Sequence, residues 1–313
     1  MNIAIQVLLL ILGFFMLIKG ADWFVEGASK IAGRFGIPQL VIGLTIVAMG
    51  TSAPEAAVSI SAALKGSAEI TIGNILGSNI LNVLLILGLT SVIQTVTVQF
   101  STIRYEIPFV FLITSLLAFM GLMDLQVGRI EGVILLVFMV IYLLYLMWMA
   151  KSGLSSEEDA PVFKATDSIP RFIFLILAGL VLIVWGSDVT VDAATALAKI
   201  FGMSERLIGL TIVAFGTSLP ELVTSVTAAL KGNSGIAVGN IVGSNIFNIL
   251  FVVGITAVIT PVAYSAGFLI DSIVAAAAML LLFFCVFRKK KLSRSGGILL
   301  LIGYALYFFY LIY

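Results

Sequence analysis

Long apolar segments, separated by short polar or glycine- and proline-containing stretches, follow one another along the whole chain. Each segment is close to or above the roughly 20 residues that an α-helix needs to cross a bilayer. We therefore predict ten membrane-spanning helices. The expected ranges are 3–30, 39–64, 70–98, 105–122, 130–149, 170–198, 206–230, 235–260, 267–287 and 296–313.

The composition supports a membrane protein. Of the 313 residues, 61% are hydrophobic and 11% are charged, and the mean hydropathy is +1.21. Soluble domains carry about 25% charged residues and cannot hide so much apolar surface. The sequence therefore predicts an all-α polytopic protein of the cell membrane. No basic face is present that could bind nucleic acid.

The absence of histidine and the single cysteine, Cys285, limit the metal chemistry. A disulfide within the chain is impossible, and zinc, haem or thiol sites lack ligands. A metal ion would have to be held by oxygen atoms, which favours hard cations such as Ca²⁺, Mg²⁺ or Na⁺.

The chain contains one sequence unit twice, at a constant separation of 166 residues. The motif at 43–55 recurs at 209–221 with two of thirteen positions changed, and 73–82 recurs at 239–248 with eight of ten identical. Each unit holds five predicted spans, an odd number, so the two units must lie inverted in the membrane, as in many secondary transporters. We predict a first five-helix repeat over 1–150, a cytoplasmic linker over 151–169 and a second, inverted repeat over 170–313.

The distribution of lysine and arginine predicts the orientation. Twelve of these residues fall on the side reached after the first span, and four fall on the other side. Because cytoplasmic loops carry the excess of positive charge, the side with twelve is expected to be cytoplasmic. Both termini are then expected to be extracytoplasmic.

Each copy of the first motif places a proline and a glutamate inside an apolar segment. Proline has no N–H group and displaces the carbonyl four residues earlier. Pro54 is therefore expected to free the carbonyl of Gly50, and Pro220 that of Gly216. Threonine and serine hydroxyls lie between each glycine and its proline. The motif predicts a kinked helix that exposes carbonyl, hydroxyl and carboxylate oxygens, which are the ligands of hard cations.

Counting residues from the turns predicts that the two glutamates meet. Glu55 lies ten residues before Lys65, and Glu221 lies ten residues before Lys231. At about 1.5 Å per residue, each glutamate is about 15 Å from its turn, and the two turns lie on opposite faces. With a hydrocarbon core about 30 Å thick, both carboxylates reach the midplane. Two buried carboxylates repel each other and are poorly solvated, and a shared cation relieves both costs.

The second motif, Gly-Asn-x-x-Gly-Ser-Asn, supplies neutral groups. Its glycines are four residues apart, which allows two helices to approach closely, so a pure packing role for them is an equal alternative. Ser78, Asn79 and Asn82 bring neutral oxygens onto the helix that returns beside Glu55, and uncompensated amides are costly in lipid. The matched Asp22 and Asp188 lie toward span ends, where capping or pairing, with Lys19 in the case of Asp22, is the favoured interpretation.

The two repeated motifs together resemble the α-repeats of the calcium/cation antiporter superfamily, in particular its Na⁺/Ca²⁺ exchanger branch. The short central loop resembles that of prokaryotic members. The resemblance implies ten helices, four ion positions at mid-membrane, and sliding of the first and sixth helices. It implies the following roles: Glu55 and Glu221 as shared carboxylate ligands of Ca²⁺ and Na⁺; Thr51 and Thr217 as backbone or hydroxyl ligands; Ser52, Ser78, Ser218 and Ser244 as ligands that complete sodium sites; Ala48 and Ala214 as carbonyl ligands; and Asn82 and Asn248 as residues that line the central position.

Asn248 also bears on the subfamily, because potassium-dependent relatives carry aspartate at this position. The amide therefore argues against K⁺ coupling. It also leaves two acidic groups in the site, which would neutralise one Ca²⁺ but not several Na⁺, so exchange is expected to be electrogenic.

These observations lead to one preferred hypothesis and three alternatives. The preferred one is a Na⁺/Ca²⁺ antiporter that works by alternating access, with Ca²⁺ and Na⁺ as substrates and no cofactor, in the bilayer as a monomer. A Ca²⁺/H⁺ antiporter would use the same two glutamates as proton carriers. A cation channel would also use acidic residues, but inverted repeats with broken helices favour alternating access. An enzyme is disfavoured because no nucleophile–base pair is evident.

Overall fold

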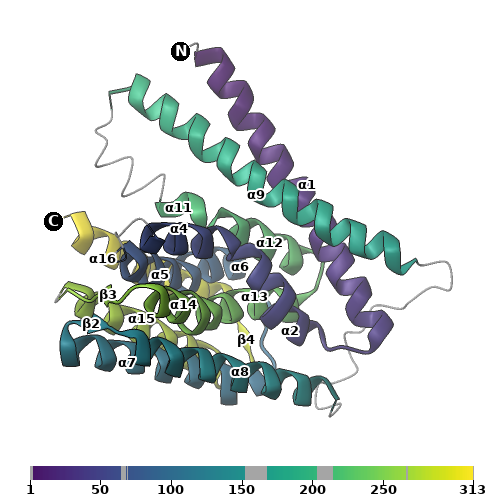
Figure 1. Cartoon of the computed structure of the whole chain (residues 1–313). Helices are drawn as coiled ribbons and strands as arrows, with labels where there is room; N and C mark the ends of the chain where they lie inside the picture. The colour runs from purple at the N-terminus through teal and green to yellow at the C-terminus, as the bar shows by residue number, and fades with distance from the viewer. Residues whose placement is uncertain are drawn as a thin grey trace.

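The computed structural model describes residues 3–64, 68, 70–151, 168–202, 214–265 and 267–312 (Figure 1). Most of the predicted linker and the segment 203–213, which includes the beginning of the second copy of the first motif, lie outside these residues. The described part is helical apart from four strands of two residues each.

Two sets of helices follow each other in the chain. In the first half they are α1 (Ile3–Phe35), α2 (Gln39–Ile42), η1 (Gly43–Val47), α3 (Ala48–Thr51), α4 (Ala53–Leu64), α5 (Ile70–Ile80), η2 (Leu81–Leu87), α6 (Gly88–Ile93), η3 (Thr102–Glu106), α7 (Ile107–Asp124) and α8 (Arg129–Lys151). In the second half they are α9 (Ile169–Ile200), α11 (Ala214–Thr217), α12 (Leu219–Leu230), α13 (Ser234–Phe247), η6 (Asn248–Val253), α14 (Gly254–Ile259), α15 (Gly267–Val286) and α16 (Arg294–Ile312). The η elements are π-helical turns, which are wider than α-helical ones.

The strands form two antiparallel pairs that each join the two halves of the chain. In the first pair, β1 (Val96–Thr97) lies against β4 (Lys291–Leu292), and in the second, β2 (Gln126–Val127) lies against β3 (Val262–Ala263). Each strand lies in a short connection between two helices, so each pair joins a connection of the first half to one of the second half.

The helices confirm an all-helical, multi-span membrane architecture. Eight helices in the described part are long and apolar enough to cross a bilayer. The helix pair Gln39–Thr51 and Ala53–Leu64, which meets at a bend of 45°, brings the number to nine if it is counted as one span. The predicted span 206–230 is described only from Ala214 onward, where it ends in α12. The predicted third span was too long, since its helix ends at Ile93, after which Gln94 is extended and β1 begins.

The two longest helices, α1 and α9, pack along each other and lie at one side of the remaining helices (Figure 1). Many of their apolar side chains are exposed, Leu8, Ile11 and Phe15 on α1 and Phe174 and Val181 on α9 among them. In a bilayer these side chains face lipid. The pair therefore forms a distinct unit beside the core.

The core is centred on α13, whose residues from Gly235 to Phe247 are all buried. A Cβ atom added to Gly239 would lie 2.8 Å from the carbonyl oxygen of Leu40 and 2.9 Å from the Cα of Gly43. One added to Gly243 would lie 2.8 Å from the Cβ of Ala48. Close helix packing is thus confirmed for the glycines of the second repeat.

The equivalent glycines of the first repeat differ. An added Cβ at Gly73 would touch only the ring of Phe268, at 3.5 Å, and one at Gly77 meets no described atom within 4 Å. The stretch that matches residues 40–48, namely 206–214, lies mostly outside the described residues. For this pair the packing prediction stays a prediction.

We predict that Gly239→Ala destabilises the protein, because the new methyl group would collide with backbone atoms of α2 and η1 that cannot move independently. Overpacking of this kind costs about 1–3 kcal/mol. The control is Gly303→Ala, where an added Cβ would lie 3.5 Å from the Leu84 side chain, an ordinary contact. The apparent melting temperature in detergent should fall clearly for Gly239→Ala and stay near wild type for the control. Equal melting temperatures would contradict the packing described here.

Candidate functional site

Both glutamates of the repeated motif follow a break in a helix. The first break is at Ser52, between α3 and α4, and the second is at Ser218, between α11 and α12. The two serines have nearly the same backbone angles, φ −85°, ψ 9° and φ −93°, ψ 5°, in a sparsely populated region that is common in active sites. Glu55 and Glu221 then lie in the first turn of the following helix. The positive end of the helix dipole there favours a carboxylate.

Hydrogen bonds between the repeats bring the two carboxylates together. Ser52 Oγ donates to Glu221 Oε1 at 2.7 Å, and Ser218 Oγ donates to Glu55 Oε1 at 3.3 Å. All four side chains are at most 1% exposed. The serine at each helix break therefore supports the glutamate of the other repeat.

Four asparagines connect the repeats in the same reciprocal way. Asn79 Nδ2 donates to the carbonyl of Asn245, and Asn245 Nδ2 donates to the carbonyl of Asn79, both at 3.2 Å. Asn82 Nδ2 donates to Asn245 Oδ1 at 3.0 Å, and Asn248 Nδ2 donates to Asn79 Oδ1 at 3.1 Å. These bonds fix the amide groups of Asn79 and Asn245 on both their nitrogen and oxygen sides. Asn82 and Asn248 take part only through their nitrogens, so their side-chain oxygens are not used in these bonds.

Four buried oxygens at this place receive no hydrogen bond. They are Oε2 of Glu55, Oε2 of Glu221, Oδ1 of Asn82 and Oδ1 of Asn248. A buried acceptor without a donor is costly, so such atoms call for an explanation. Carboxylate and amide oxygens are the preferred ligands of hard cations. Within the described ranges no three residues of the types His, Cys, Asp and Glu gather, so two carboxylates and neutral oxygens form the available ligand set.

One asparagine from each repeat supports the main chain beside the glutamate of that repeat. Asn240 Nδ2 donates to Ser225 Oγ at 2.9 Å and to the carbonyl of Glu221 at 3.3 Å, while its Oδ1 accepts a bond from Thr51 at 2.9 Å. Asn74 donates equivalent bonds to the serine and the glutamate carbonyl of the first repeat. These two asparagines were not predicted to belong to the site, although each is the first asparagine of the repeated Gly-Asn motif.

The remaining residues implied by the family resemblance also lie at this site or on its helices. Ser244 Oγ is 3.4 Å from both Glu221 Oε1 and the carbonyl of Ala48. Ser78 Oγ lies 3.5 Å from Ser218 Oγ. The other two positions, Ala214 and Thr217, are the first and last residues of α11.

The prediction that Pro220 frees the Gly216 carbonyl from the helix agrees with the structure, but this oxygen is not exposed. It accepts a hydrogen bond of 2.8 Å from Ser187 Oγ of α9. Ser187 is only 4% exposed. The buried Ser187 hydroxyl therefore takes the place of the backbone N–H that Pro220 lacks, and it satisfies the Gly216 carbonyl oxygen.

Asp22 has a structural role, as its position predicted. Lys19 Nζ lies 3.3 Å from Asp22 Oδ2, which confirms the expected pair. A second partner, Lys231, lies closer, with Nζ 2.6 Å from Asp22 Oδ1. This contact was missed because the two residues are far apart in the chain.

Comparison with known proteins identifies the family. The family model described as "Sodium/calcium exchanger protein" matches residues 5–148 and 171–313. The putative antiporter CaxA of Alkalimonas amylolytica is 43% identical, over 82% of this chain and 82% of its own. The sodium/calcium exchanger MaX1 of Methanosarcina acetivorans is 30% identical, over 83% and 85%. The solved structure of the sodium–calcium exchanger NCX_Mj soaked with Na⁺ and Ca²⁺ superposes with a TM-score of 0.82 at 33% identity, over 96% and 97%.

The unmatched oxygens predict that Ca²⁺ stabilises the folded protein. Binding at one hundred times the dissociation constant contributes about 2.7 kcal/mol, so the apparent melting temperature in detergent should rise with Ca²⁺ concentration. Glu221→Gln should abolish this rise. Glu131→Gln, which changes a carboxylate in the first turn of α8, should keep it. A rise that survives in Glu221→Gln would place Ca²⁺ elsewhere.

Proposed function

Because the chain belongs to the sodium/calcium exchanger family, we propose that it exchanges Na⁺ for Ca²⁺ across the membrane, with both ions competing for the site between Glu55 and Glu221. The observation that carries this proposal is the set of four buried oxygens, two carboxylate and two amide, that lack donors at the junction of the repeats. The protein acts as a secondary active transporter and not as an enzyme.

The charge of the site explains why the ions compete. Two carboxylates balance the charge of one Ca²⁺, and the amide and hydroxyl oxygens around them suit Na⁺ as well. With neither ion present, two buried negative charges repel each other in a medium that solvates them poorly. The protein can therefore close and change access only when the site holds Ca²⁺ or Na⁺. Because the empty protein does not return, Ca²⁺ crosses in one direction only when Na⁺ crosses in the other.

The ligands we assign beside the two glutamates are the hydroxyl, carbonyl and amide groups at the helix breaks and on the returning helices. They are Thr51, Thr217, Ser52, Ser218, Ser78, Ser244, Asn82, Asn248, Ala48 and Ala214. Hydrogen bonds within the described residues connect Thr51, Ser52, Ser78, Ser218 and Ser244 to the site and hold the amides of Asn82 and Asn248.

Alternating access follows from the reciprocal construction. The serine–glutamate bonds and the asparagine bonds each occur twice with the repeats exchanged. Such a pattern supports two symmetry-related repeats, and a single chain contains both halves of the site. The odd number of spans predicted for each repeat adds that the two are inverted five-helix units, ten helices in all, and the lysine and arginine distribution adds extracytoplasmic termini. Exchanging the conformations of the two repeats would then open the site to the other side.

A Ca²⁺/H⁺ antiporter is the second candidate, because the same buried glutamates can carry protons. The serines, threonines and asparagines that surround them are favourable ligands for Na⁺ and are not needed for a proton carrier. A channel would require a continuous pore instead of a closed, mutually bonded site.

The deciding experiment is Ca²⁺ uptake into proteoliposomes under imposed gradients. An internal Na⁺ load should drive uptake, and a pH gradient of either direction without Na⁺ should not. A membrane potential should change the rate of Na⁺-driven uptake, since two carboxylates cannot neutralise several Na⁺. Uptake driven by protons and insensitive to Na⁺ would refute the proposal in favour of the second candidate.

Neutralising either carboxylate should abolish exchange. Glu55→Gln and Glu221→Gln keep the shape of the side chain but remove one of two charges that hold Ca²⁺. Both variants are expected to show Na⁺-driven uptake at the level of protein-free liposomes, while Glu131→Gln transports like wild type. Wild-type transport by both glutamine variants would exclude these carboxylates from the mechanism.

A further inference from the structure

The α1 and α9 helices behave as one body because their backbones are in contact. Glycines occur every seven residues on α1, at Gly13, Gly20 and Gly27. A Cβ added to Gly20 would lie 2.8 Å from the carbonyl oxygen of Gly179, and one added to Gly179 would lie 2.7 Å from that of Gly20. Two helices that touch through their main chains cannot slide past each other without breaking this fit. Any displacement relative to the core therefore carries both.

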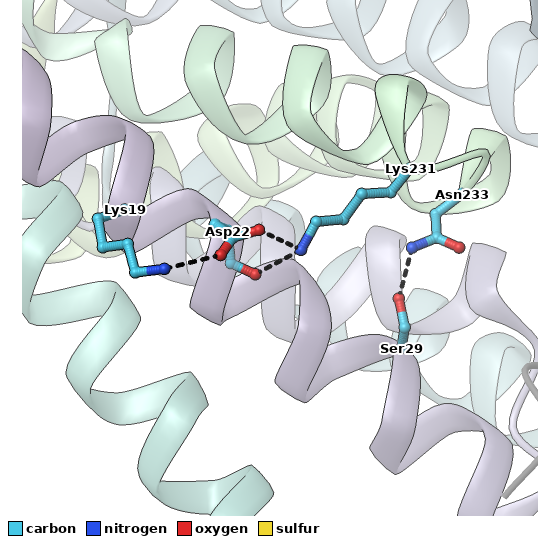
Figure 2. A network of polar contacts seen from close by, with 5 residues as sticks. All are labelled: Lys19, Asp22, Ser29, Lys231 and Asn233. Atoms are coloured by element: carbon cyan, nitrogen blue, oxygen red, sulfur yellow. Dashed lines mark hydrogen bonds and ion pairs between the residues drawn. The ribbon is translucent and has the colours of Figure 1, made fainter.

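Polar contacts attach this body to the second repeat at the end of α12. Lys231 Nζ, just beyond α12, lies 2.6 Å from Asp22 Oδ1 and donates to the Asp22 carbonyl at 2.8 Å. Asn233 Nδ2 donates to Ser29 Oγ at 2.7 Å. Figure 2 shows Asp22 between Lys19 and Lys231, with the Ser29–Asn233 bond farther along α1. The loop after α12 is thus joined to α1 at two neighbouring places.

A further contact attaches the body to α11, the short helix before α12. Ser187 of α9 donates to the carbonyl of Gly216 in α11, two residues before the break at Ser218. Glu221 lies in the first turn of α12, just after this break. The contacts of Ser187 and Asp22 therefore lie before and after the helix that carries one of the two carboxylates.

The repeat does not reproduce this attachment in the described part of the first half. Position 21, which matches Ser187, is Ala21 and has no hydroxyl group. Asp188 matches Asp22, and Lys65, which matches Lys231, lies outside the described residues. Among the described residues, the side-chain contacts above fasten the α1–α9 body to the second repeat.

We propose that Asp22, Ser29 and Ser187 are positioning residues of the transport cycle, which hold the α1–α9 body against α11 and the loop after α12 in one access state and release it in the other. This inference rests on the proposed exchange function. The Asp22 and Lys231 side chains are 38% and 30% exposed, and ion pairs at such positions are weak. The contact is therefore able to bias the equilibrium between the two states and still break in every cycle.

A reversible cross-link tests whether the contact opens. Ser29→Cys and Asn233→Cys are combined with Cys285→Ala, which removes the only native cysteine. Their short native side chains are in contact, which favours a disulfide. The oxidised protein should keep the Ca²⁺-dependent rise in melting temperature but lose Na⁺-driven uptake, and a reductant should restore uptake. The single-cysteine variants should be insensitive to oxidation.

The outcomes separate the two proposals. A fully oxidised protein that transports at the rate of the reduced protein would overturn the positioning role, because the contact would then stay closed throughout the cycle. A reduced protein with no Na⁺-driven uptake, when the cysteine-free protein also shows none, would refute the exchange function itself.

Removing either charge gives a second, independent test. Asp22→Asn should shift the balance of access states by about two- to fivefold, the effect of a weak ion pair on a two-state equilibrium. The apparent KM for Ca²⁺ should then move in opposite directions at the two faces of the membrane. Lys231→Gln, which removes the charge of the other partner, should move the two values in the same directions as Asp22→Asn does. Equal changes at the two faces for both variants, or no change at either face, would indicate a purely structural ion pair.

Discussion

The rest of the structure depends on the bond between each helix-break serine and the glutamate of the opposite repeat. A carboxylate inside an apolar solvent needs partners, and neither repeat supplies them all for its own glutamate. Ser52 reaches Glu221, and Ser218 reaches Glu55. For these bonds to form, both helices must stop and bend at the same depth. The repeated Gly-Thr-Ser-x-Pro-Glu sequence provides that break twice.

The helices around the breaks are arranged to serve this contact. The glycines of α13 bring its backbone against α2 and η1, which places Ser244 near the carbonyl of Ala48. Wide π-helical turns begin at Leu81 and at Asn248, next to the asparagines that link the repeats. Such turns are frequent at functional sites because the extra residue rotates the side chains that follow. Close packing and local widening together set the directions of the amide groups.

Much of this could be predicted from the sequence, because the strongest signals are repeated. Apolar segments indicate the spans, and the second copy of a proline–glutamate motif distinguishes Glu55 from an isolated buried charge. The rule for Pro220 was correct that the Gly216 carbonyl leaves the helix and wrong that its oxygen is exposed, since it considers only neighbours in the chain. Ser187 lies 29 residues before Gly216, and its hydroxyl is an ordinary residue type in an apolar helix.

The other contacts that were not predicted also join residues that are far apart in the sequence. Lys231 and Asp22 are 209 residues apart, and nothing in either local sequence indicates the other. The π-helical turns at Leu81–Leu87 and Asn248–Val253 have no sequence signal of their own either, because apart from Asn82 and Asn248 their residues are ordinary apolar ones. Asn74 and Asn240 could have been found, since each stands at a fixed place in a motif that occurs twice.

The exchange of bonds between Asn79 and Asn245 shows that the two repeats meet through matching surfaces. Each asparagine donates to the main chain of its counterpart at the matching position, which is the pattern that two identical copies related by a two-fold axis make. Two separate molecules of one repeat would therefore be able to form the same bonds. Joining the copies in one chain allows the halves to differ, and Ser187 opposite Ala21 is a difference that a symmetric dimer of identical chains cannot contain.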